Sequence, residues 1–118
     1  LIQINQMKIY HNPRCRKSRE GIKYLESKKI NFEVIDYIKN NLSSEQIRNI
    51  LKKLQLKPIE IVRKNEAIWK EKYKGKDFTD DQLIRILSNE PKLIERPIIV
   101  SEKLGVIGRP AENIDKLL

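Results

Sequence analysis

The sequence is organised around the stretch Lys8-Ile9-Tyr10-His11-Asn12-Pro13-Arg14-Cys15-Arg16-Lys17-Ser18-Arg19. Residues 8–10 have the composition of a short β-strand, Asn12-Pro13 is typical of a tight turn, and a helix is expected to begin at Cys15. A cysteine at the start of a helix meets unpaired backbone N–H groups and the positive end of the helix dipole, and both favour an anion. We therefore expect Cys15 to be a thiolate nucleophile.

The charge of this stretch supports the same interpretation. It contains five basic residues and no acidic one: Lys8, Arg14, Arg16, Lys17 and Arg19. Such surroundings favour a thiolate and attract an anionic substrate. A lone cysteine is more often a small buried hydrophobe without a chemical role. A cysteine flanked by basic residues fits a core badly, however, so the reactive interpretation is the stronger one.

The length of 118 residues is enough for one domain with one core. We expect this domain to cover residues 7–118. Met7, the only methionine, directly precedes the first strand, so it is expected to be the natural start, with residues 1–6 an upstream or vector-derived remnant. No run approaches the roughly 18 apolar residues of a membrane span, and nothing resembles a signal peptide. A cytoplasmic location is the resulting expectation.

The single cysteine excludes an internal disulfide and a cysteine-rich zinc site, and with one histidine beside it no metal site is expected. Any redox cycle must therefore take its second thiol from another molecule. The net charge of +9 would suit nucleic acid. Outside the Cys15 stretch, however, basic residues alternate with acidic ones, and the few aromatic residues form no stacking series, so nucleic acid is not an expected partner.

The first third of the chain predicts a βαβ unit. Residues 15–28 show helical spacing, and Gly21 in the middle of this helix suggests close packing against a sheet. Residues 31–37 alternate like a strand, with Phe32 and Val34 expected to face inward. A strand, a helix and a second strand within about 30 residues predict two parallel strands joined by a right-handed crossover.

The rest of the chain predicts a helical insertion followed by a hairpin. Residues 39–92 contain helical patterns, two of them opened by the capping boxes Ser43/Gln46 and Thr79/Gln82. Residues 98–100 and 106–107 are short β-rich runs suited to an antiparallel hairpin, and a last helix begins near residue 110. The predicted class is α/β: a thioredoxin-like βαβ…ββα sheet with a helical insertion at about residues 39–92 between its halves.

Three arginines stand at the ends of predicted elements: Arg63, Arg96 and Arg109. In this architecture the strand ends and the start of the first helix converge at one edge. A guanidinium offers planar, bidentate donors to a tetrahedral oxyanion and stays charged at any working pH. Each arginine alone would be an ordinary surface residue, but three of them near a thiolate indicate an oxyanion site.

Four motifs carry a resemblance to a known family: H-N-P-R-C-x-K-S-R-E at 11–20, R-K-N-E at 63–66, L-I-E-R-P-I-I-V at 93–100 and I-G-R-P-x-E at 107–112. They resemble, in order and spacing, the glutaredoxin-coupled arsenate reductases of the ArsC type, within a wider group that includes the Spx-like proteins. The resemblance covers about residues 7–118.

The resemblance implies a role for each matching residue. Cys15 would be the catalytic nucleophile and His11 would help to lower the pKa of its thiol. Arg63, Arg96 and Arg109 would hold the oxyanion. Pro97 would be a cis proline facing the site, and Asn12 would support the turn before the cysteine.

The implied reaction is the reduction of arsenate to arsenite. Arsenate would lie between the helix start and the arginines, where the Cys15 thiolate attacks arsenic. Glutathione, a co-substrate rather than a bound cofactor, would supply the second thiol, and glutaredoxin would resolve the adduct. Ser18 occupies the place of the second cysteine of a two-cysteine motif; its hydroxyl would hydrogen-bond the thiolate or be an ordinary polar residue of the first turn. Nothing in the sequence requires a dimer, and we expect a monomer with no membrane partner.

One departure from the family pattern leaves alternatives open. Arg16 and Lys17 stand where well-studied members have small residues, so they either face solvent and recruit glutathione or glutaredoxin, or narrow the oxyanion site. The chain could instead be a glutathione-dependent thiol reductase without physiological arsenate activity. A third interpretation is an Spx-like regulator that binds RNA polymerase, although Ser18 removes the second cysteine of that family's C-x-x-C switch.

Overall fold

A mixed four-stranded sheet in the order β2-β1-β3-β4 forms the middle of the molecule. The computed structural model describes residues 7–118, so the prediction made for residues 1–6 lies outside the described residues. The strands are β1 (Met7–His11), β2 (Phe32–Asp36), β3 (Ile98–Val100) and β4 (Gly105–Ile107). Strand β1 is parallel to β2 and antiparallel to β3, and β3 is antiparallel to β4. The predicted βαβ unit and the predicted hairpin are both confirmed.

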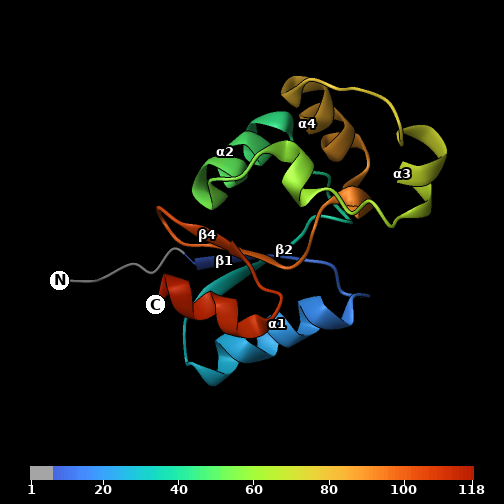
Figure 1. Ribbon diagram of the computed structural model, residues 1–118. Helices are drawn as coiled ribbons and strands as arrows, with labels where there is room; N and C mark the ends of the chain where they lie inside the picture. Colours follow the sequence, from blue (N-terminus) through green and yellow to red (C-terminus); the bar gives the residue numbers. More distant parts are fainter. Residues whose placement is uncertain (1–6) are drawn as a thin grey trace.

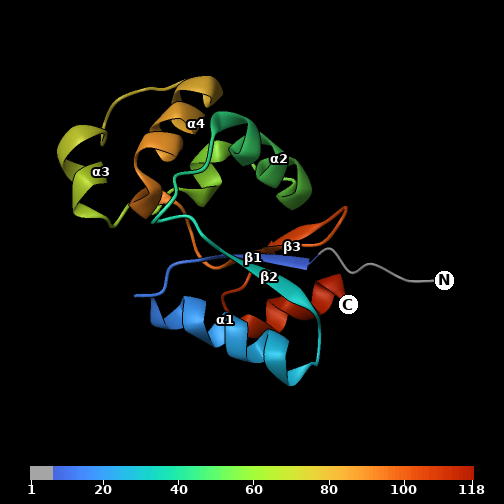
Figure 2. The ribbon, with the colours of Figure 1, turned by 180° about the vertical axis from the view of Figure 1, so that it is seen from behind.

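One face of the sheet is covered by helix α1 (Arg16–Ser27) and the 3₁₀ helix η3 (Ala111–Leu117), which lie side by side in Figures 1 and 2. Side chains from the sheet and both helices form one buried cluster: Met7, Ile9, Leu25, Ile99 and Ile114. Gly21 lies where α1 approaches the sheet. A methyl group added there would be 3.0 Å from Pro97 Cγ and 3.3 Å from Ile9 Cδ1, so the predicted close packing is confirmed.

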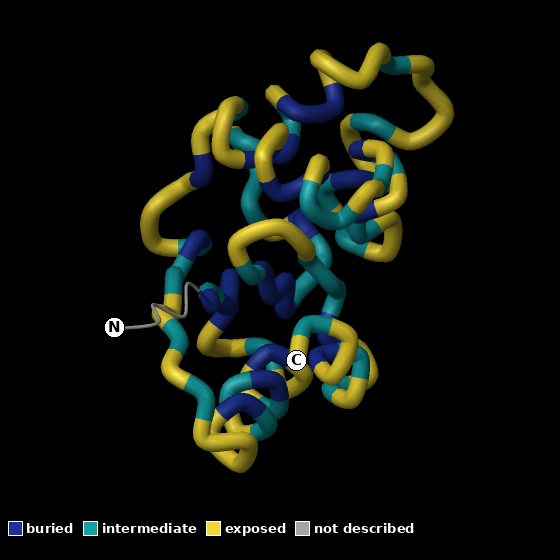
Figure 3. The backbone as a smooth tube through the Cα atoms, turned by 90° about the vertical axis from the view of Figure 1, so that its left-hand side faces the viewer, coloured by how far each residue is buried: buried dark blue, intermediate teal, exposed yellow. Residues whose placement is uncertain are grey.

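The helical insertion covers the other face of the sheet (Figures 1 and 2). It comprises α2 (Ser44–Leu54), η1 (Pro58–Ile61), α3 (Ala67–Lys72), α4 (Asp80–Asn89) and η2 (Pro91–Leu93). Both predicted capping boxes form, at the N-termini of α2 and α4. Tyr10, Ile98 and Val100 point from the sheet into this layer. Buried stretches of chain therefore lie on both sides of the sheet (Figure 3), and no helix within residues 7–118 has the length and apolar character to cross a membrane.

The burial that an inward-facing Val34 implies is wrong. Phe32 packs against the α1 side of the sheet as expected, but Val34 is 46% exposed. Strand β2 pairs only with β1 and is the edge of the sheet. The alternation of a strand identifies the face to which a residue belongs, but not whether a helix reaches far enough to cover that face.

A short antiparallel bridge joins the insertion to the segment that leads into β3. Val62 pairs with Ile94 outside the main sheet. The backbone N–H of Arg63 donates to the Leu93 carbonyl at 2.7 Å, and the N–H of Glu95 donates to the Ile61 carbonyl at 2.8 Å. This bridge fixes the backbone of residue 63 beside that of residues 93–95, close to where Arg96 begins the approach to β3.

Candidate functional site

The turn between β1 and α1 presents Cys15 at the end of the sheet. The Cys15 N–H donates to the Asn12 carbonyl at 3.0 Å, and Asn12 Oδ1 accepts from the Arg14 N–H at 3.0 Å. Cys15 is the N-cap of α1, with extended backbone angles (φ −95°, ψ 120°). Cys15 is half-buried, and its side chain makes no capping hydrogen bond to α1. Cys15 thus lies at the start of the helix, as predicted.

The pKa of the Cys15 thiol is lowered from its ordinary value. Burial alone would raise this pKa, but the backbone N–H groups of Ser18 and Lys17 and the guanidinium of Arg96 together outweigh burial by favouring the thiolate. The lowered pKa agrees with the expectation made from the helix start, but the cationic side chain that contributes is that of Arg96 and not those of the basic residues flanking Cys15 in sequence. The role of Cys15 as a nucleophile stays a prediction.

The buried hydroxyl of Ser18 stabilises the turn before Cys15 through two hydrogen bonds. Ser18 is fully buried, its Oγ lies 2.6 Å from His11 Nδ1, and it accepts the Asn12 N–H at 3.0 Å. The pKa of His11 is lowered, mainly by burial, with the Asp36 carboxylate opposing this effect and Arg19 adding to it. The lowered pKa favours the uncharged imidazole, and its contact with Ser18 holds the inner side of the cysteine turn in place. The hydrogen bonds of the Ser18 hydroxyl are thus to His11 and Asn12 rather than to the thiolate, and Ser18 is a buried residue of the first turn of α1.

Arg96 is the arginine that reaches Cys15. Its side chain is 11% exposed, and its Nη1 donates to the Lys92 carbonyl at 3.0 Å. Arg96 Nε is buried and has no hydrogen-bond partner within residues 7–118. A buried donor without a partner is costly, so an acceptor that reached this N–H would relieve that cost. The Arg96–Pro97 peptide is cis, as expected, and so is the peptide before Pro110.

The other two arginines flank Arg96 in different ways. Arg109 is exposed, and its Nη1 donates to the Arg96 carbonyl at 3.3 Å. Arg63 is paired with two carboxylates: its Nε lies 3.3 Å from Glu66 Oε2 and its Nη1 lies 3.4 Å from Glu95 Oε1. The three arginines gather near one edge of the sheet, but Arg63 is already engaged by acidic side chains.

Sequence reasoning missed Tyr37, which lies among these groups. Tyr37 is fully buried, and its hydroxyl donates to the Ile94 carbonyl at 3.2 Å. Its pKa is raised, chiefly by burial; Arg96 and Arg63 oppose the rise, and Cys15 adds to it. The charges of Arg96, Arg63 and Cys15 therefore all affect the pKa of the Tyr37 hydroxyl. In the sequence Tyr37 is only the last residue of a strand-like run, and no pattern marks its role.

Arg16 and Lys17 turn away from the candidate oxyanion site. Their side chains are 81% and 48% exposed, and both pair with Glu20 on the outer face of α1, at 3.4 and 3.5 Å. The sequence left open whether Arg16 and Lys17 face solvent or narrow the oxyanion site, and in the structure they face solvent. They do not narrow the space around Cys15.

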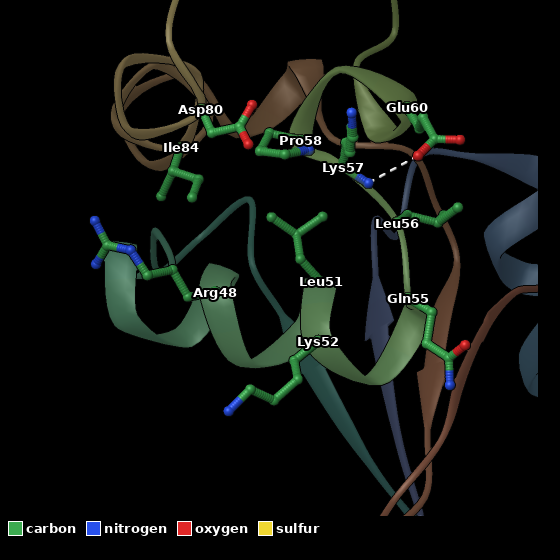
Figure 4. Close-up of a pocket in the computed structure, with 10 residues that line it drawn as sticks. All are labelled: Arg48, Leu51, Lys52, Gln55, Leu56, Lys57, Pro58, Glu60, Asp80 and Ile84. Carbon is green, nitrogen blue, oxygen red and sulfur yellow. Dashed lines mark hydrogen bonds between the residues drawn. The ribbon is translucent and has the colours of Figure 1, made fainter.

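A separate pocket between α2, η1 and the start of α4 is drawn in Figure 4. Its walls come from the insertion, for example Leu51, Pro58 and Ile84, and none of its lining residues belongs to the cysteine turn or is one of the three arginines. This pocket is therefore distinct from the candidate site around Cys15.

Comparisons with a family model, with sequence relatives and with solved structures all lead to the same family. The model of the ArsC family matches residues 10–117. An arsenate reductase of Neisseria meningitidis serogroup A is 34% identical over 115 residues, which are 96% of this chain and 98% of the relative. An uncharacterized protein of Escherichia coli is 37% identical over 111 residues, 92% of this chain and 93% of the relative. The solved structure of an arsenate reductase from Vibrio cholerae superposes with a TM-score of 0.92 at 36% identity, covering 98% of this chain and all of that one.

Proposed function

The chain belongs to the ArsC family, and we propose that it is an arsenate reductase that converts arsenate to arsenite with Cys15 as nucleophile and with external thiols as reductant. One observation carries the proposal: the Cys15 thiol, with its lowered pKa, lies beside Arg96, whose buried Nε has no partner among residues 7–118. A thiolate next to an unoccupied guanidinium donor is suited to attack on a bound oxyanion.

In the proposed reaction, arsenate binds against Arg96 with Arg109 and Arg63 beside it. The Cys15 thiolate forms a sulfur–arsenic bond, and one arsenic–oxygen bond breaks, the oxygen leaving as water after protonation. The donors of Arg96 and the N-terminus of α1 stabilise the negative charge on the remaining oxygens.

Reduction of As(V) to As(III) requires two electrons. Two thiols supply them when they join as a disulfide, and Cys15 is the one cysteine of the sequence. The second thiol must therefore come from outside the chain, and we assign it to glutathione. Over one turnover arsenite leaves and a disulfide between Cys15 and glutathione remains, which glutaredoxin reduces by thiol exchange. A reducing compartment, such as the cytoplasm, keeps Cys15 available for the next cycle.

The test is a coupled assay with arsenate, glutathione, glutaredoxin and an NADPH-dependent recycling system. We expect arsenate-dependent loss of NADPH with the wild-type protein and only background with Cys15→Ser. Equal rates for the two proteins would contradict the proposal.

A second candidate is a glutathione-dependent thiol reductase of the same family. The pairing of Arg63 with Glu66 and Glu95 favours it, because two carboxylates reduce the positive charge available to an oxyanion. Arg96 cannot separate the two candidates, since it also stabilises the Cys15 thiolate. Arg109 is the better choice, because the one hydrogen bond that its side chain makes within residues 7–118 is to the backbone carbonyl of Arg96. Arg109→Ala is expected to lower kcat/KM for arsenate by about tenfold or more while leaving reduction of a glutathionylated peptide unchanged; a pure thiol reductase would show peptide turnover without any arsenate turnover.

A further inference from the structure

The carboxylate of Glu66 lies between two of the arginines. Its Oε2 atom is 3.3 Å from Arg63 Nε and 3.9 Å from Arg96 Nη2. Glu95, the other acidic residue nearby, pairs with Arg63 alone, at 3.4 Å. Glu66 is thus the acidic residue that faces both guanidiniums.

The backbone brings these side chains together. Arg63 and Glu66 flank the turn that leads into α3, with Glu66 as its N-cap, and the Glu66 N–H donates to the Arg63 carbonyl at 3.2 Å. Arg96 follows the bridge between Val62 and Ile94. Glu66 makes no side-chain capping hydrogen bond with α3. Its carboxylate therefore does not cap the helix, and its ion pairs are with Arg63 and Arg96.

We propose that Glu66 is the resident anion of the arginine site: its carboxylate holds Arg63 and Arg96 together in the empty site and leaves them when a tetrahedral oxyanion binds, so that Glu66 sets the affinity of the site for its substrate. This inference rests on the proposed function, because it assumes that the arginines receive an oxyanion.

The geometry indicates that the carboxylate can be displaced. Strong charge-assisted contacts between guanidinium and carboxylate have N···O distances of about 2.7–2.9 Å, and those of Glu66 are longer. The Glu66 side chain is 26% exposed, so water can solvate its carboxylate once it moves. Partly exposed ion pairs of this kind are weak. An oxyanion, in contrast, gains the buried Arg96 Nε that no group within residues 7–118 satisfies.

The same geometry indicates that Glu66 opposes binding. A carboxylate that moves aside but stays nearby repels a dianion and continues to attract the two guanidiniums. Glutamine in its place retains the size and one acceptor oxygen but removes the charge. Both arginines would then be available to the substrate.

The experiment measures the binding of inorganic phosphate, a tetrahedral oxyanion that thiols do not reduce, by titration calorimetry of the reduced protein at low salt. We expect Glu66→Gln to bind phosphate about fivefold more tightly than the wild type, with the gain shrinking at high salt. Glu95→Gln, the matched control, removes the same charge from Arg63 but not from Arg96, and should change affinity less than Glu66→Gln does. Glu66→Asp keeps the charge on a shorter side chain, and its affinity for phosphate should lie between those of the wild type and Glu66→Gln.

The outcomes separate this inference from the function beneath it. If the wild type binds phosphate and reduces arsenate, but Glu66→Gln and Glu66→Asp bind no more tightly, the inference is overturned and the proposed function stands. If neither wild type nor variants bind phosphate, and the coupled assay shows no arsenate turnover, the proposed function fails and the inference fails with it.

Discussion

Replacing Gly21 by alanine should test whether the packing of α1 against the sheet positions the candidate site. The added methyl group would lie 3.0 Å from Pro97 Cγ and 3.3 Å from Ile9 Cδ1. Pro97 Cγ belongs to a ring and cannot turn aside, and Ile9 Cδ1, although it ends a side chain, is fully buried beside the central strand β1. The methyl group must therefore move α1, the sheet or the residue beside Arg96.

The magnitude follows from two opposing effects. Overpacking a well-filled interior costs about 1–3 kcal/mol, and the 3.0 Å approach to the rigid ring of Pro97 places Gly21 toward the upper end of that range. Alanine in place of glycine inside a helix recovers about 1 kcal/mol. We expect a net loss of about 1–2 kcal/mol in the free energy of unfolding, which corresponds to a fall of roughly 4–8 °C in Tm. Displacement of Arg96 should lower kcat/KM for arsenate by about tenfold.

The assay is thermal unfolding of the reduced protein together with the coupled arsenate assay. Lys23→Ala is the matched control, because Lys23 is exposed on the same helix and should change stability by less than about 0.5 kcal/mol. If Gly21→Ala were as stable and as active as the wild type, the close contact between α1 and Pro97 could not be what positions Arg96.

Three further predictions concern the cysteine turn. The pKa of His11 is lowered mainly by burial, so the folded state favours the neutral imidazole. The contribution of His11 to the free energy of unfolding should therefore be fully present above about pH 6.5 and be lost as the pH falls below that value. Urea unfolding at pH 7.5 and 5.5 measures this loss, and His11→Gln should make it smaller. Cys15 should react with iodoacetamide at lower pH than an ordinary cysteine, and Arg96→Gln should shift this profile to higher pH whereas Arg109→Gln should not; an unshifted Arg96→Gln profile would show that the guanidinium does not stabilise the thiolate. Ser18→Ala should cost about 2–3 kcal/mol in urea unfolding, because the Asn12 N–H and the His11 ring lose their buried partner; a smaller loss would mean that another group replaces the hydroxyl.

Much of the fold could be predicted because its signals are local. The capping boxes at Ser43 and Thr79 depend on residues three positions apart, and the βαβ unit depends on a change of period within about 30 residues. The exposure of Val34 could not be predicted in this way. It depends on which strand ends up at the edge of the sheet, a property of the whole topology.

In the candidate site, too, features that depend on neighbouring residues could be predicted, and contacts between distant residues could not. The placement of Cys15 at a helix start could be predicted from its own neighbours, and the backbone N–H groups there favour a thiolate. The contribution of Arg96 could not, because Arg96 is far from Cys15 in the sequence. The carboxylates that pair with Arg63 could not, because Glu95 is far from it in sequence and the Glu66 contact depends on how a turn folds. Tyr37 was missed for the same reason: its hydroxyl meets the Ile94 carbonyl across 57 residues, and no spacing in the sequence encodes that contact.

The bridge between Val62 and Ile94 makes the spacing of Arg63 and Arg96 a property of the main chain. Its two hydrogen bonds use backbone groups, so side-chain substitutions in the distal part of the insertion leave them intact. The segment around Gly75, between α3 and α4, is exposed and lies outside the bridge. Engineered changes of length or sequence, such as a peptide tag or a fluorescent label, can therefore be placed there, since loops of this kind tolerate insertion while the arginines keep their separation.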